Sequence, residues 1–425
     1  MSHVVVEAKS KLRGTVKVPG DKSASHRAVL LSALASGTST IEGLSPGLDV
    51  RGTATIVAQL GASVTFDDKV VTITGPTNGL SGSVDPLDCG NSGTTIRLVS
   101  GLVASIEGAH TLIGDHSLSQ RPMDRVALPL RLMGASISGV GDRETPPLII
   151  TGSELHSITY DVPVPSAQVK SAILLAGLRA SGETVVREAV RTRTATEDML
   201  ANAGIAITSE PTGEGRVIRL QPGRPSPQQW KVPTDPSQAA FFAVLGLIAA
   251  RASITILDVE SSPERIGFVN VLQRLGGDID VEDRRGVSTL TVRSSDLHAT
   301  EIHATEIPSV DEAPILSIAA AAATGVTVFR DMGELRLKES DRFEGCMLLA
   351  RSVGANTWAD GDDFYIEGLG SARNFQHFSI NPGLDHRMVM SAAVAGTAGS
   401  GCIIENPETV SSSYPGFFTD LASLS

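Results

Sequence analysis

Six segments of the chain share one order of hydrophobic and polar positions. Each has a short β-branched stretch, a turn of polar residues with Pro or Gly, and an Ala- and Leu-rich run that ends at a Gly-containing turn and another β-branched stretch. The Ala-rich run is apolar on every side, which predicts a buried helix rather than an amphipathic one. The segments recur about every 70 to 75 residues and begin near Val16, Leu87, Tyr160, Trp230, Thr305 and Phe378.

A second, more amphipathic helix is predicted inside these repeats, commonly running into Gly and a further strand. Examples are DVRGTATIVAQLGASVTF, which begins at Asp49, and RIGFVNVLQRLGGDIDV, which begins at Arg265. Each repeat is therefore expected to be a unit of the βαβαββ type. Six such units predict an α/β protein of two pseudo-symmetric domains with three units each.

The domain boundary is predicted in the stretch QPGRPSPQQ, residues 221–229, because Pro, Gly and Gln are typical of linkers. A second crossing is expected near residues 18–20, since the first strand could pair with the C-terminal half. One domain would then comprise residues 21–228 and the other residues 1–20 and 229–425. A chain of 425 residues is also too long for one ordinary core.

The bulk composition excludes several classes of protein. Hydrophobic residues make up 41% and charged residues 19%, as in a folded globular chain. A net charge of −12 argues against general affinity for nucleic acid or anionic membranes. Cys89, Cys346 and Cys402 are far apart, so neither a disulfide framework nor a zinc site is expected. The first ten residues lack a signal sequence, and residues 239–250 are too short a run to cross a membrane. We therefore expect a cytoplasmic protein.

The turns before the predicted helices carry the candidate chemistry, because a helix N-terminus presents free N–H groups and attracts anions. In the first repeat, Ser23 and Arg27 are four residues apart and share a helix face. Lys22 stands at the start of that helix as a compact charge that suits a phosphate or an enol oxygen. The alternative for these residues is an N-cap with solvated charges.

The second and third repeats show the same design. Residues 89–97 form a loop of small residues that lets backbone N–H groups approach an oxyanion, and Arg121 precedes a Pro at a helix start. Ser166 and Gln168 offer a hydroxyl and an amide that suit a sugar-like ring, and Arg193 precedes the next helix. Taken singly, the loop is more often an ordinary tight turn and Arg121 a surface arginine. The turns of Ser166, Gln168 and Arg193 would pass as helix caps.

The fifth and sixth repeats add carboxylates to the cations. Residues 311–312 place two carboxylates before an Ala-rich helix, where such residues commonly serve as caps. Lys338, Glu339 and Arg342 form a mixed face that could be a surface salt-bridge strip, and Arg387 lies at another helix start. The cations recur at equivalent ends of repeats from both halves of an acidic chain. This recurrence predicts a cleft between the two domains that holds more than one anion.

The chain resembles the EPSP synthases from about Val16 to Pro415. The motifs PGDKSASHR, GNSGTTIR, QRPMDR, PSAQVKSA, LRLKESDR and LDHRMVM, with the Asp311 turn, occur in the order of that family. SAQVKSAILLAGL and the Arg193 turn are more similar to the bacterial branch described as glyphosate-tolerant than to the plant-like branch.

The resemblance implies an inside-out α/β barrel of two domains, each built of three βαβαββ-type units, that close on substrate. It implies transfer of the enolpyruvyl group of phosphoenolpyruvate to the 5-hydroxyl of shikimate 3-phosphate, with release of phosphate, in aromatic amino acid biosynthesis. It implies no metal and no organic cofactor, and we expect a monomer.

The resemblance also assigns roles to individual residues. Those implied for shikimate 3-phosphate are Lys22, Ser23, Arg27, Ser166, Ala167 through its backbone, Gln168, Arg193, Asp311 and Lys338. Those implied for phosphoenolpyruvate are Lys22, Gly93, Arg121, Gln168, Arg342 and Arg387. Asp311 would be the base on the 5-hydroxyl, while Glu339 and Lys22 would handle the proton at the enol carbon.

Two departures from the family pattern and two rival families bear on these expectations. Residues 411–413 are Ser-Ser-Ser where the plant-like branch carries a Lys, and Gly93 stands where a strongly tolerant type would carry Ala. The sister transferase acting on UDP-N-acetylglucosamine would have Lys-Asn at Lys22-Ser23 and a loop Cys near Arg121. A sliding-clamp-like ring would carry Lys and Arg along its repeated helices, but here those helices are apolar.

Overall fold

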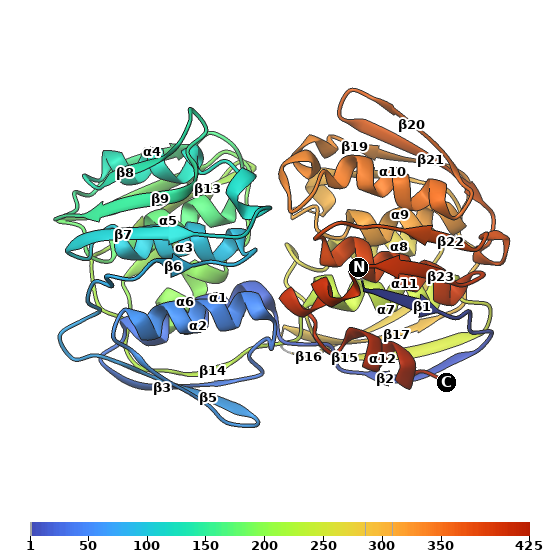
Figure 1. Cartoon of the computed structure of the whole chain (residues 1–425), viewed down its shortest axis with the longest axis horizontal. Helices are drawn as coiled ribbons and strands as arrows, with labels where there is room; N and C mark the ends of the chain where they lie inside the picture. The colour runs from blue at the N-terminus through green and yellow to red at the C-terminus, as the bar shows by residue number, and fades with distance from the viewer. Residues whose placement is uncertain (1, 285, 308) are drawn as a thin grey trace. The chain divides into compact units, whose positions relative to one another are not determined.

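The computed structural model describes residues 2–284, 286–307 and 309–425 and divides into two compact units. Unit 1 comprises Met1–Asp21 and Pro233–Ser425, and unit 2 comprises Lys22–Val232. Unit 2 is drawn from blue to green in Figure 1, and unit 1 mainly from yellow to red. Among the described residues, no helix is both long and apolar enough to span a membrane.

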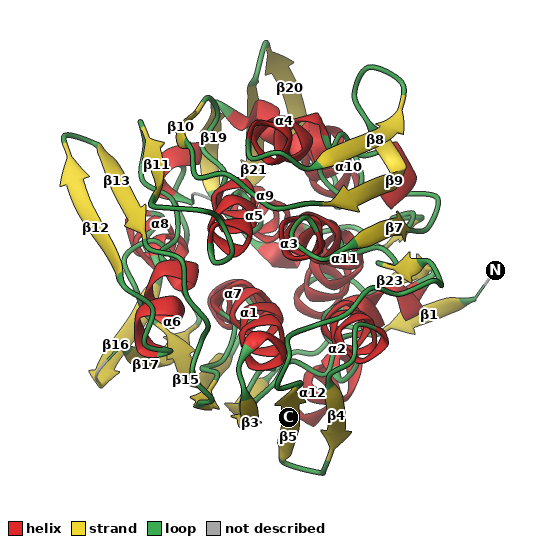
Figure 2. Ribbon diagram, turned by 90° about the vertical axis from the view of Figure 1, so that its left-hand side faces the viewer, coloured by secondary structure: helices red, strands yellow, loops and turns green. Residues whose placement is uncertain are grey.

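Unit 2 buries the first helix of each repeat and carries its sheets on the outside, as Figure 2 shows from the side of this unit. A helix that is apolar all round must be covered on every side, and here neighbouring helices and sheets cover it. The approach is close where α3 meets α5, because a Cβ on Gly101 would lie 2.2 Å from the carbonyl oxygen of Ala172. The buried helices are α1 (Lys22–Leu34), α3 (Gly93–Val103) and α5 (Ala167–Gly177), and the outer helices are α2 (Leu48–Gln59), α4 (Asp124–Leu132) and α6 (Ala195–Asn202).

The sheets of unit 2 have four strands each, with one parallel pair and an antiparallel hairpin. Their strand orders are β14-β3-β5-β4, β6-β7-β9-β8 and β10-β11-β13-β12. The strands are β3 (Gly37–Glu42), β4 (Ser63–Phe66), β5 (Val70–Gly75), β6 (Leu87–Asp88), β7 (Gly108–Ile113), β8 (Ser136–Val140), β9 (Thr145–Gly152), β10 (Thr159–Val162), β11 (Thr184–Glu188), β12 (Ile207–Thr212), β13 (Gly215–Leu220) and β14 (Gln229–Lys231).

Unit 1 repeats this plan around three helices that contact one another, α7 (Pro236–Ile248), α9 (Ala313–Ala322) and α11 (His386–Ala398). The outer helices are α8 (Gly267–Arg274), α10 (Arg342–Ser352) and α12 (Phe417–Ser423). The sheets have the orders β16-β17-β15-β2, β18-β19-β21-β20 and β1-β23-β22. The strands are β1 (His3–Val6), β2 (Leu12–Val16), β15 (Ala252–Glu260), β16 (Asp278–Arg284), β17 (Val287–Arg293), β18 (Glu301–His303), β19 (Thr324–Arg330), β20 (Asn356–Asp360), β21 (Asp363–Leu369), β22 (Phe378–Ile380) and β23 (Cys402–Glu405).

The first and fourth repeats exchange their opening strands. β2 opens the first repeat but pairs in parallel with β15, and β14 opens the fourth repeat but pairs in parallel with β3. The chain crosses between the units after Asp21 and after Val232, so the predicted boundary at residue 228 falls inside unit 2. Residues 221–229 are held against the rest of unit 2 by Arg224, which donates hydrogen bonds to the carbonyl groups of Leu34, Ala35, Pro76 and Thr77.

The predicted inside-out α/β arrangement is confirmed, with one difference in the sixth repeat. After β23 this repeat continues into a 3-10 helix (Pro407–Ser412) and α12, where the plan predicts a helix and a hairpin. The N-terminal strand β1 pairs antiparallel with β23 and completes a three-stranded sheet. The expected βαβαββ order therefore does not extend to the end of the chain.

A buried ion cluster stabilises the interior of unit 2. The Lys170 side chain on α5 has no exposed surface, and its Nζ lies 3.0 Å from Glu188 Oε2 and 2.8 Å from Glu197 Oε1. It also donates to the carbonyl oxygen of Arg193 at 3.0 Å, which fixes the turn before α6. Burial raises the pKa of Glu197, and Lys170 opposes that rise. Both carboxylates therefore share this ammonium group, while Glu197 Oε1 also lies 4.0 Å from Arg216 Nη1.

We expect Lys170→Met to lower the free energy of unfolding of unit 2 by about 3 to 5 kcal/mol, because buried carboxylates lose their partner. Chemical denaturation of the full chain measures this loss. The control is Arg219→Met, which removes the half-exposed Arg219–Glu183 pair and should cost less than about 1 kcal/mol. Equal losses in the two variants would contradict a role for burial in the Lys170 cluster.

Candidate active site

The first candidate cation of unit 2, Lys22, begins α1 and pairs with a carboxylate. Its Nζ lies 3.2 Å from Oδ2 of Asp49, which belongs to the first turn of α2. The two side chains are 14% and 8% exposed, so the alternative of a solvated charge does not hold for Lys22. The neighbouring hydroxyls of Thr53 and Thr95 are hydrogen-bonded at 2.9 Å and link α2 to α3. The position of Lys22 is thus set by the start of a second helix as well as by its own.

Arg27 is buried at the meeting point of α1, α5 and α6. It donates from Nε to Thr196 Oγ1 at 2.6 Å, and from Nη2 to Ser171 Oγ at 2.7 Å. Its Nη1 donates to the carbonyl oxygen of Ser23 at 2.9 Å, one helical turn back. Arg193 in turn donates to Ser23 Oγ at 3.2 Å. Ser23 therefore joins Arg27 and Arg193 in one group, through its carbonyl oxygen to Arg27 and through its hydroxyl to Arg193.

The start of α5 is connected to the start of α3 through an amide. Gln168 accepts from Arg97 Nη1 at 2.6 Å and donates from Nε2 to Thr94 Oγ1 at 2.9 Å. Ser166 is the N-cap of α5, and its hydroxyl accepts from the backbone N–H of Val169. The capping role that was the alternative for Ser166 is therefore present in the structure. Ala167 is the first residue of that helix.

Gly93 begins α3 in a space limited by two guanidinium groups. A Cβ at this position would lie 3.0 Å from Nη1 of Arg97 and 3.1 Å from Nη1 of Arg121. Arg121 is 5% exposed and donates from Nη2 to Asn91 Oδ1 at 2.9 Å and to Ser117 Oγ at 3.2 Å. The structure therefore places Arg121 in the interior beside the small-residue loop, and the surface alternative is wrong.

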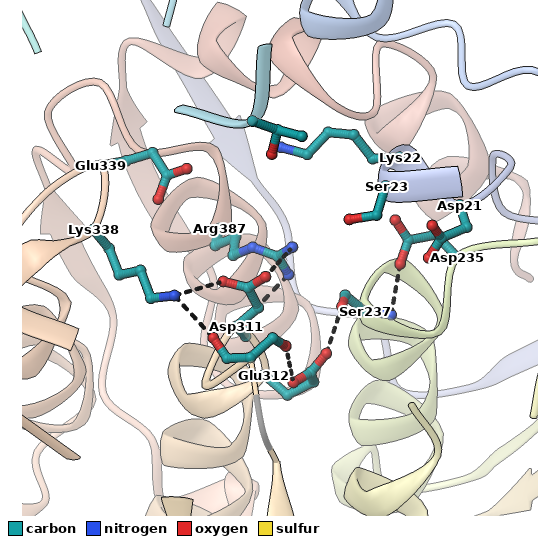
Figure 3. A network of polar contacts seen from close by, with 12 residues as sticks. Asp21, Lys22, Ser23, Asp235, Ser237, Asp311, Glu312, Lys338, Glu339 and Arg387 are labelled. Atoms are coloured by element: carbon teal, nitrogen blue, oxygen red, sulfur yellow. Dashed lines mark hydrogen bonds and ion pairs between the residues drawn. The ribbon is translucent and has the colours of Figure 1, made fainter. Parts of the chain in front are cut away.

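In unit 1, Asp311 is surrounded by three cations, two of which, Lys338 and Arg387, are labelled in Figure 3. Its carboxylate lies 3.1 Å from Arg342 Nη1, 3.5 Å from Arg387 Nη2 and 3.8 Å from Lys338 Nζ. Arg387 also donates to the backbone carbonyl oxygen of Asp311 at 3.2 Å. The carboxylate keeps 21% of its side-chain surface exposed, so a ligand can reach it although it is flanked by positive charge.

Arg342 connects Asp311 to two further carboxylates. It contacts Glu339 Oε2 at 2.8 Å and Asp385 Oδ2 at 2.8 Å, and its side chain is 1% exposed. Burial acts to lower the pKa of Arg342, but Asp385, Glu339 and Asp311 raise it above the ordinary value. Burial likewise tends to raise the pKa of Asp385, yet the Arg342 guanidinium outweighs it and holds that pKa below the usual range. Both groups therefore remain ionised.

These contacts decide between the alternatives for the unit 1 residues. The mixed face of Lys338, Glu339 and Arg342 is not a surface strip, because Arg342 is buried and its partners include Asp385. The N-cap residue of α9 is Glu312, whose side chain makes no capping hydrogen bond. Asp311, one residue earlier, lies among cations instead.

Each unit gathers a distinct part of the predicted set. Unit 2 holds Lys22, Ser23, Arg27, Gly93, Arg121, Ser166, Ala167, Gln168 and Arg193. Unit 1 holds Asp311, Lys338, Glu339, Arg342 and Arg387.

Among the charged residues whose side chains contact those of the candidates, Asp49, Arg97 and Asp385 were not predicted as site residues. Arg97 was visible as the residue four after Gly93, a spacing that brings its side chain back over the loop. Asp49 and Asp385 both stand at helix starts, where an acidic residue is usually explained as a favourable partner of the helix dipole.

Comparison with known proteins gives one consistent result. The sequence profile described as EPSP synthase (3-phosphoshikimate 1-carboxyvinyltransferase) matches residues 6–421. The 3-phosphoshikimate 1-carboxyvinyltransferase of Streptococcus sanguinis (strain SK36) is 41% identical over 422 residues, which cover 97% of both chains. The enzyme of that name from Geobacillus thermodenitrificans (strain NG80-2) is 42% identical over 428 residues, covering 98% of this chain and 97% of the relative.

Solved structures agree with the sequence comparisons. EPSP synthase from Acinetobacter baumannii superposes with a TM-score of 0.84 and 37% identity, covering 99% of this chain and 97% of that chain. The enolpyruvyl transferase NikO from Streptomyces tendae has a TM-score of 0.78 at 19% identity, covering 99% and 96% of the two chains, a likeness of fold. With matches along nearly its whole length in sequence and in structure, the chain belongs to the EPSP synthase family of 3-phosphoshikimate 1-carboxyvinyltransferases.

Proposed function

We propose that the chain transfers the enolpyruvyl group of phosphoenolpyruvate to the 5-hydroxyl of shikimate 3-phosphate and releases phosphate. The products are 5-enolpyruvylshikimate 3-phosphate and inorganic phosphate, and the reaction belongs to the shikimate pathway of aromatic amino acid biosynthesis. The family membership supports this reaction. We further propose a cytoplasmic, monomeric enzyme that uses neither a metal nor an organic cofactor.

The observation that carries the proposal is the placement of Asp311 among Lys338, Arg342 and Arg387. A carboxylate that a ligand can reach suits removal of a hydroxyl proton. Cations on either side suit the carboxylate and phosphate of the other reactant, because hydrogen bonds between charged groups contribute about 1.5 to 3 kcal/mol each. A base and an anion site therefore occur together, as a reaction between a hydroxyl and a phosphorylated enol requires.

Shikimate 3-phosphate is assigned mainly to unit 2. Its phosphate would bind Arg27, Arg193 and Ser23, since both arginines already donate hydrogen bonds to Ser23. Gln168, with Ser166 and the backbone of Ala167, would face the hydroxyl groups of the ring. Lys22 completes this set, and Asp311 and Lys338 of unit 1 are the further ligands that we assign to the acceptor.

Phosphoenolpyruvate is assigned to residues from both units. Arg342 and Arg387 of unit 1 supply two guanidinium groups beside Asp311. Lys22, Gln168, Arg121 and the backbone at Gly93 are the ligands proposed from unit 2. The space beside the Gly93 Cα supports this assignment, because an anion there would lie next to the guanidinium group of Arg121.

The reaction needs an addition followed by an elimination. In the addition, the 5-hydroxyl loses its proton to Asp311 while its oxygen attacks C2 of phosphoenolpyruvate, and the methylene carbon gains a proton. In the elimination, phosphate leaves C2 as the new methyl group loses a proton. This restores the carbon–carbon double bond and gives the vinyl ether of the product. We assign the proton at this carbon to Glu339 and Lys22, so that an acid and a base flank the reacting carbons.

A phosphate-release assay tests the function as a whole. We expect release only when shikimate 3-phosphate and phosphoenolpyruvate are both present. The sister transferase is tested by replacing shikimate 3-phosphate with UDP-N-acetylglucosamine. Phosphate release from phosphoenolpyruvate with UDP-N-acetylglucosamine but not with shikimate 3-phosphate would overturn the proposal.

Asp311→Asn should lower kcat by about 10²- to 10⁴-fold, the usual contribution of a general base. Binding of shikimate 3-phosphate, measured by calorimetry, should survive because the amide retains the shape of the carboxylate. The control is Asp258→Asn, which changes a half-exposed carboxylate paired with Lys17. Near-normal turnover of Asp311→Asn would reassign Asp311 to a structural role.

Arg387→Gln should raise KM for phosphoenolpyruvate by at least about tenfold, because one charge-assisted contact is lost, and should change KM for shikimate 3-phosphate much less. Arg387 is preferred to Arg342, since loss of Arg342 would also leave the buried Asp385 without its guanidinium partner. Steady-state kinetics with each substrate varied in turn measure both values, with Arg373→Gln at an exposed site as control. Equal increases in both KM values would refute the division of anion sites.

Glyphosate should inhibit the enzyme competitively with phosphoenolpyruvate, and Gly93→Ala should weaken that inhibition. The added methyl would lie 3.0 to 3.1 Å from the guanidinium groups of Arg97 and Arg121, so these side chains must move and the anion site must narrow. The variant should also lose some affinity for phosphoenolpyruvate. Inhibition is measured at fixed shikimate 3-phosphate, and equal resistance of the two forms would show that Gly93 does not border the inhibitor site.

A further inference from the structure

The backbone that carries Asp311 is held in an unfavourable conformation. Val310 has a φ of +49°, a left-handed value that β-branched residues rarely adopt. Its side chain is buried, and its N–H donates to the carbonyl oxygen of Ile307 at 2.6 Å. A conformation of this kind persists where surrounding contacts hold it in place. The contacts of the next residues along the chain show what holds it.

Glu312 connects this turn to a different helix. Its carboxylate is buried, with 3% of the residue exposed, and accepts hydrogen bonds from Ser237 Oγ on α7 and from Ser309 Oγ at 3.3 Å. Figure 3 shows the two adjacent acids pointing apart, Asp311 toward Lys338 and Arg387, and Glu312 toward Ser237. The first turn of α7 is therefore tied to the residue that follows Asp311.

The N-cap of α7 is bound to a buried cation, Arg265, which contacts Asp21 and Asp235. Burial tends to lower the pKa of Arg265, but the charges of Asp21, Asp235 and Glu312 raise it above the ordinary value. Asp235 caps α7 and accepts from the N–H of Ser237 at 2.9 Å. Ser237 is thus fixed through its backbone by Asp235, while its hydroxyl fixes Glu312.

Ser309 closes the arrangement on the other side of the turn. Its hydroxyl donates to Glu312, and its carbonyl oxygen accepts from Lys338 Nζ at 3.0 Å. Lys338 also faces the carboxylate of Asp311. Through Ser309, the contacts of Glu312 therefore help to fix both the turn that carries Asp311 and the position of Lys338.

We propose that Glu312 is a positioning residue, which acts through Ser237 and Ser309 to hold the Asp311 carboxylate at the angle its reaction requires. This rests on the proposed function, in which Asp311 is the base. Glu312 does not act as the base itself, because its carboxylate is buried and accepts from Ser237 on the side away from Lys338 and Arg387. Displacing a reacting group by a fraction of an ångström to one ångström lowers the rate with little effect on binding.

Four variants of the full-length chain test the proposal. Ser237→Ala and Glu312→Ala should each lower kcat by about tenfold or more, with KM for both substrates within about threefold of the parent values. The double variant should lose no more kcat than Glu312→Ala alone, because both changes break the same Ser237–Glu312 hydrogen bond. Glu312→Gln keeps an oxygen that accepts from Ser237, so it should retain most of kcat. Ser317→Ala, a buried serine on α9 whose hydroxyl donates to the Pro314 carbonyl oxygen, is the matched control and should remain within about twofold of the parent.

Each outcome decides for or against the proposal. Unchanged kcat in folded Ser237→Ala and Glu312→Ala overturns it, and so does a loss in Glu312→Gln as large as that of Asp311→Asn, which would make Glu312 a base. If Glu312→Ala does not fold, Ser237→Ala decides alone. Failure of the proposed function is seen separately, as absence of phosphate release by the parent enzyme. In that case, the coupling between Ser237 and Glu312 in a double-mutant unfolding cycle still tests whether the tie exists.

Discussion

The meeting of helix N-termini inside each unit is the constraint on which the rest of the structure depends. In unit 1, Ser237 at the start of α7 contacts Glu312 at the start of α9, and Arg387 at the start of α11 contacts Asp311. Helices that are apolar all round pack against each other along their length, and the charged residues of the inner helices lie within their first two turns. The positive ends of several dipoles and their unsatisfied N–H groups therefore gather in one place.

The two units meet this constraint with different residues. In unit 1 the N-cap positions of α7, α9 and α11 are occupied by Asp235, Glu312 and Asp385, and the cations Arg265 and Arg342 lie among them. In unit 2 the N-caps of α3 and α5 are the neutral residues Ser92 and Ser166. The same repeated fold thus carries acidic N-caps at the inner helices of unit 1 and neutral N-caps at α3 and α5 of unit 2.

Features that depend on local order could be predicted from the sequence, and features that depend on distant pairing could not. The helix start at Lys22 follows from the repeat and its turns, whereas residues 93–97, which were expected in a loop, form the first turn of α3. The exchange of β2 and β14 could be predicted only in part, because nothing in a strand's own residues identifies the strand with which it pairs. The ion pair of Arg342 with Asp385 spans 43 residues of sequence, and so a buried network looked like a surface strip.

The exchanged strands also set an order in which the molecule can be completed during synthesis. All of unit 2 lies in one continuous stretch, Lys22–Val232, so its sheets have every strand once Val232 has left the ribosome. Unit 1 begins earlier but must leave β2 without its partner until β15 is made, and β1 until β23 is made. Because domains fold as units during translation, the half of the protein that starts second is the first that can finish. The N-terminal strands meanwhile present unpaired edges to the growing chain.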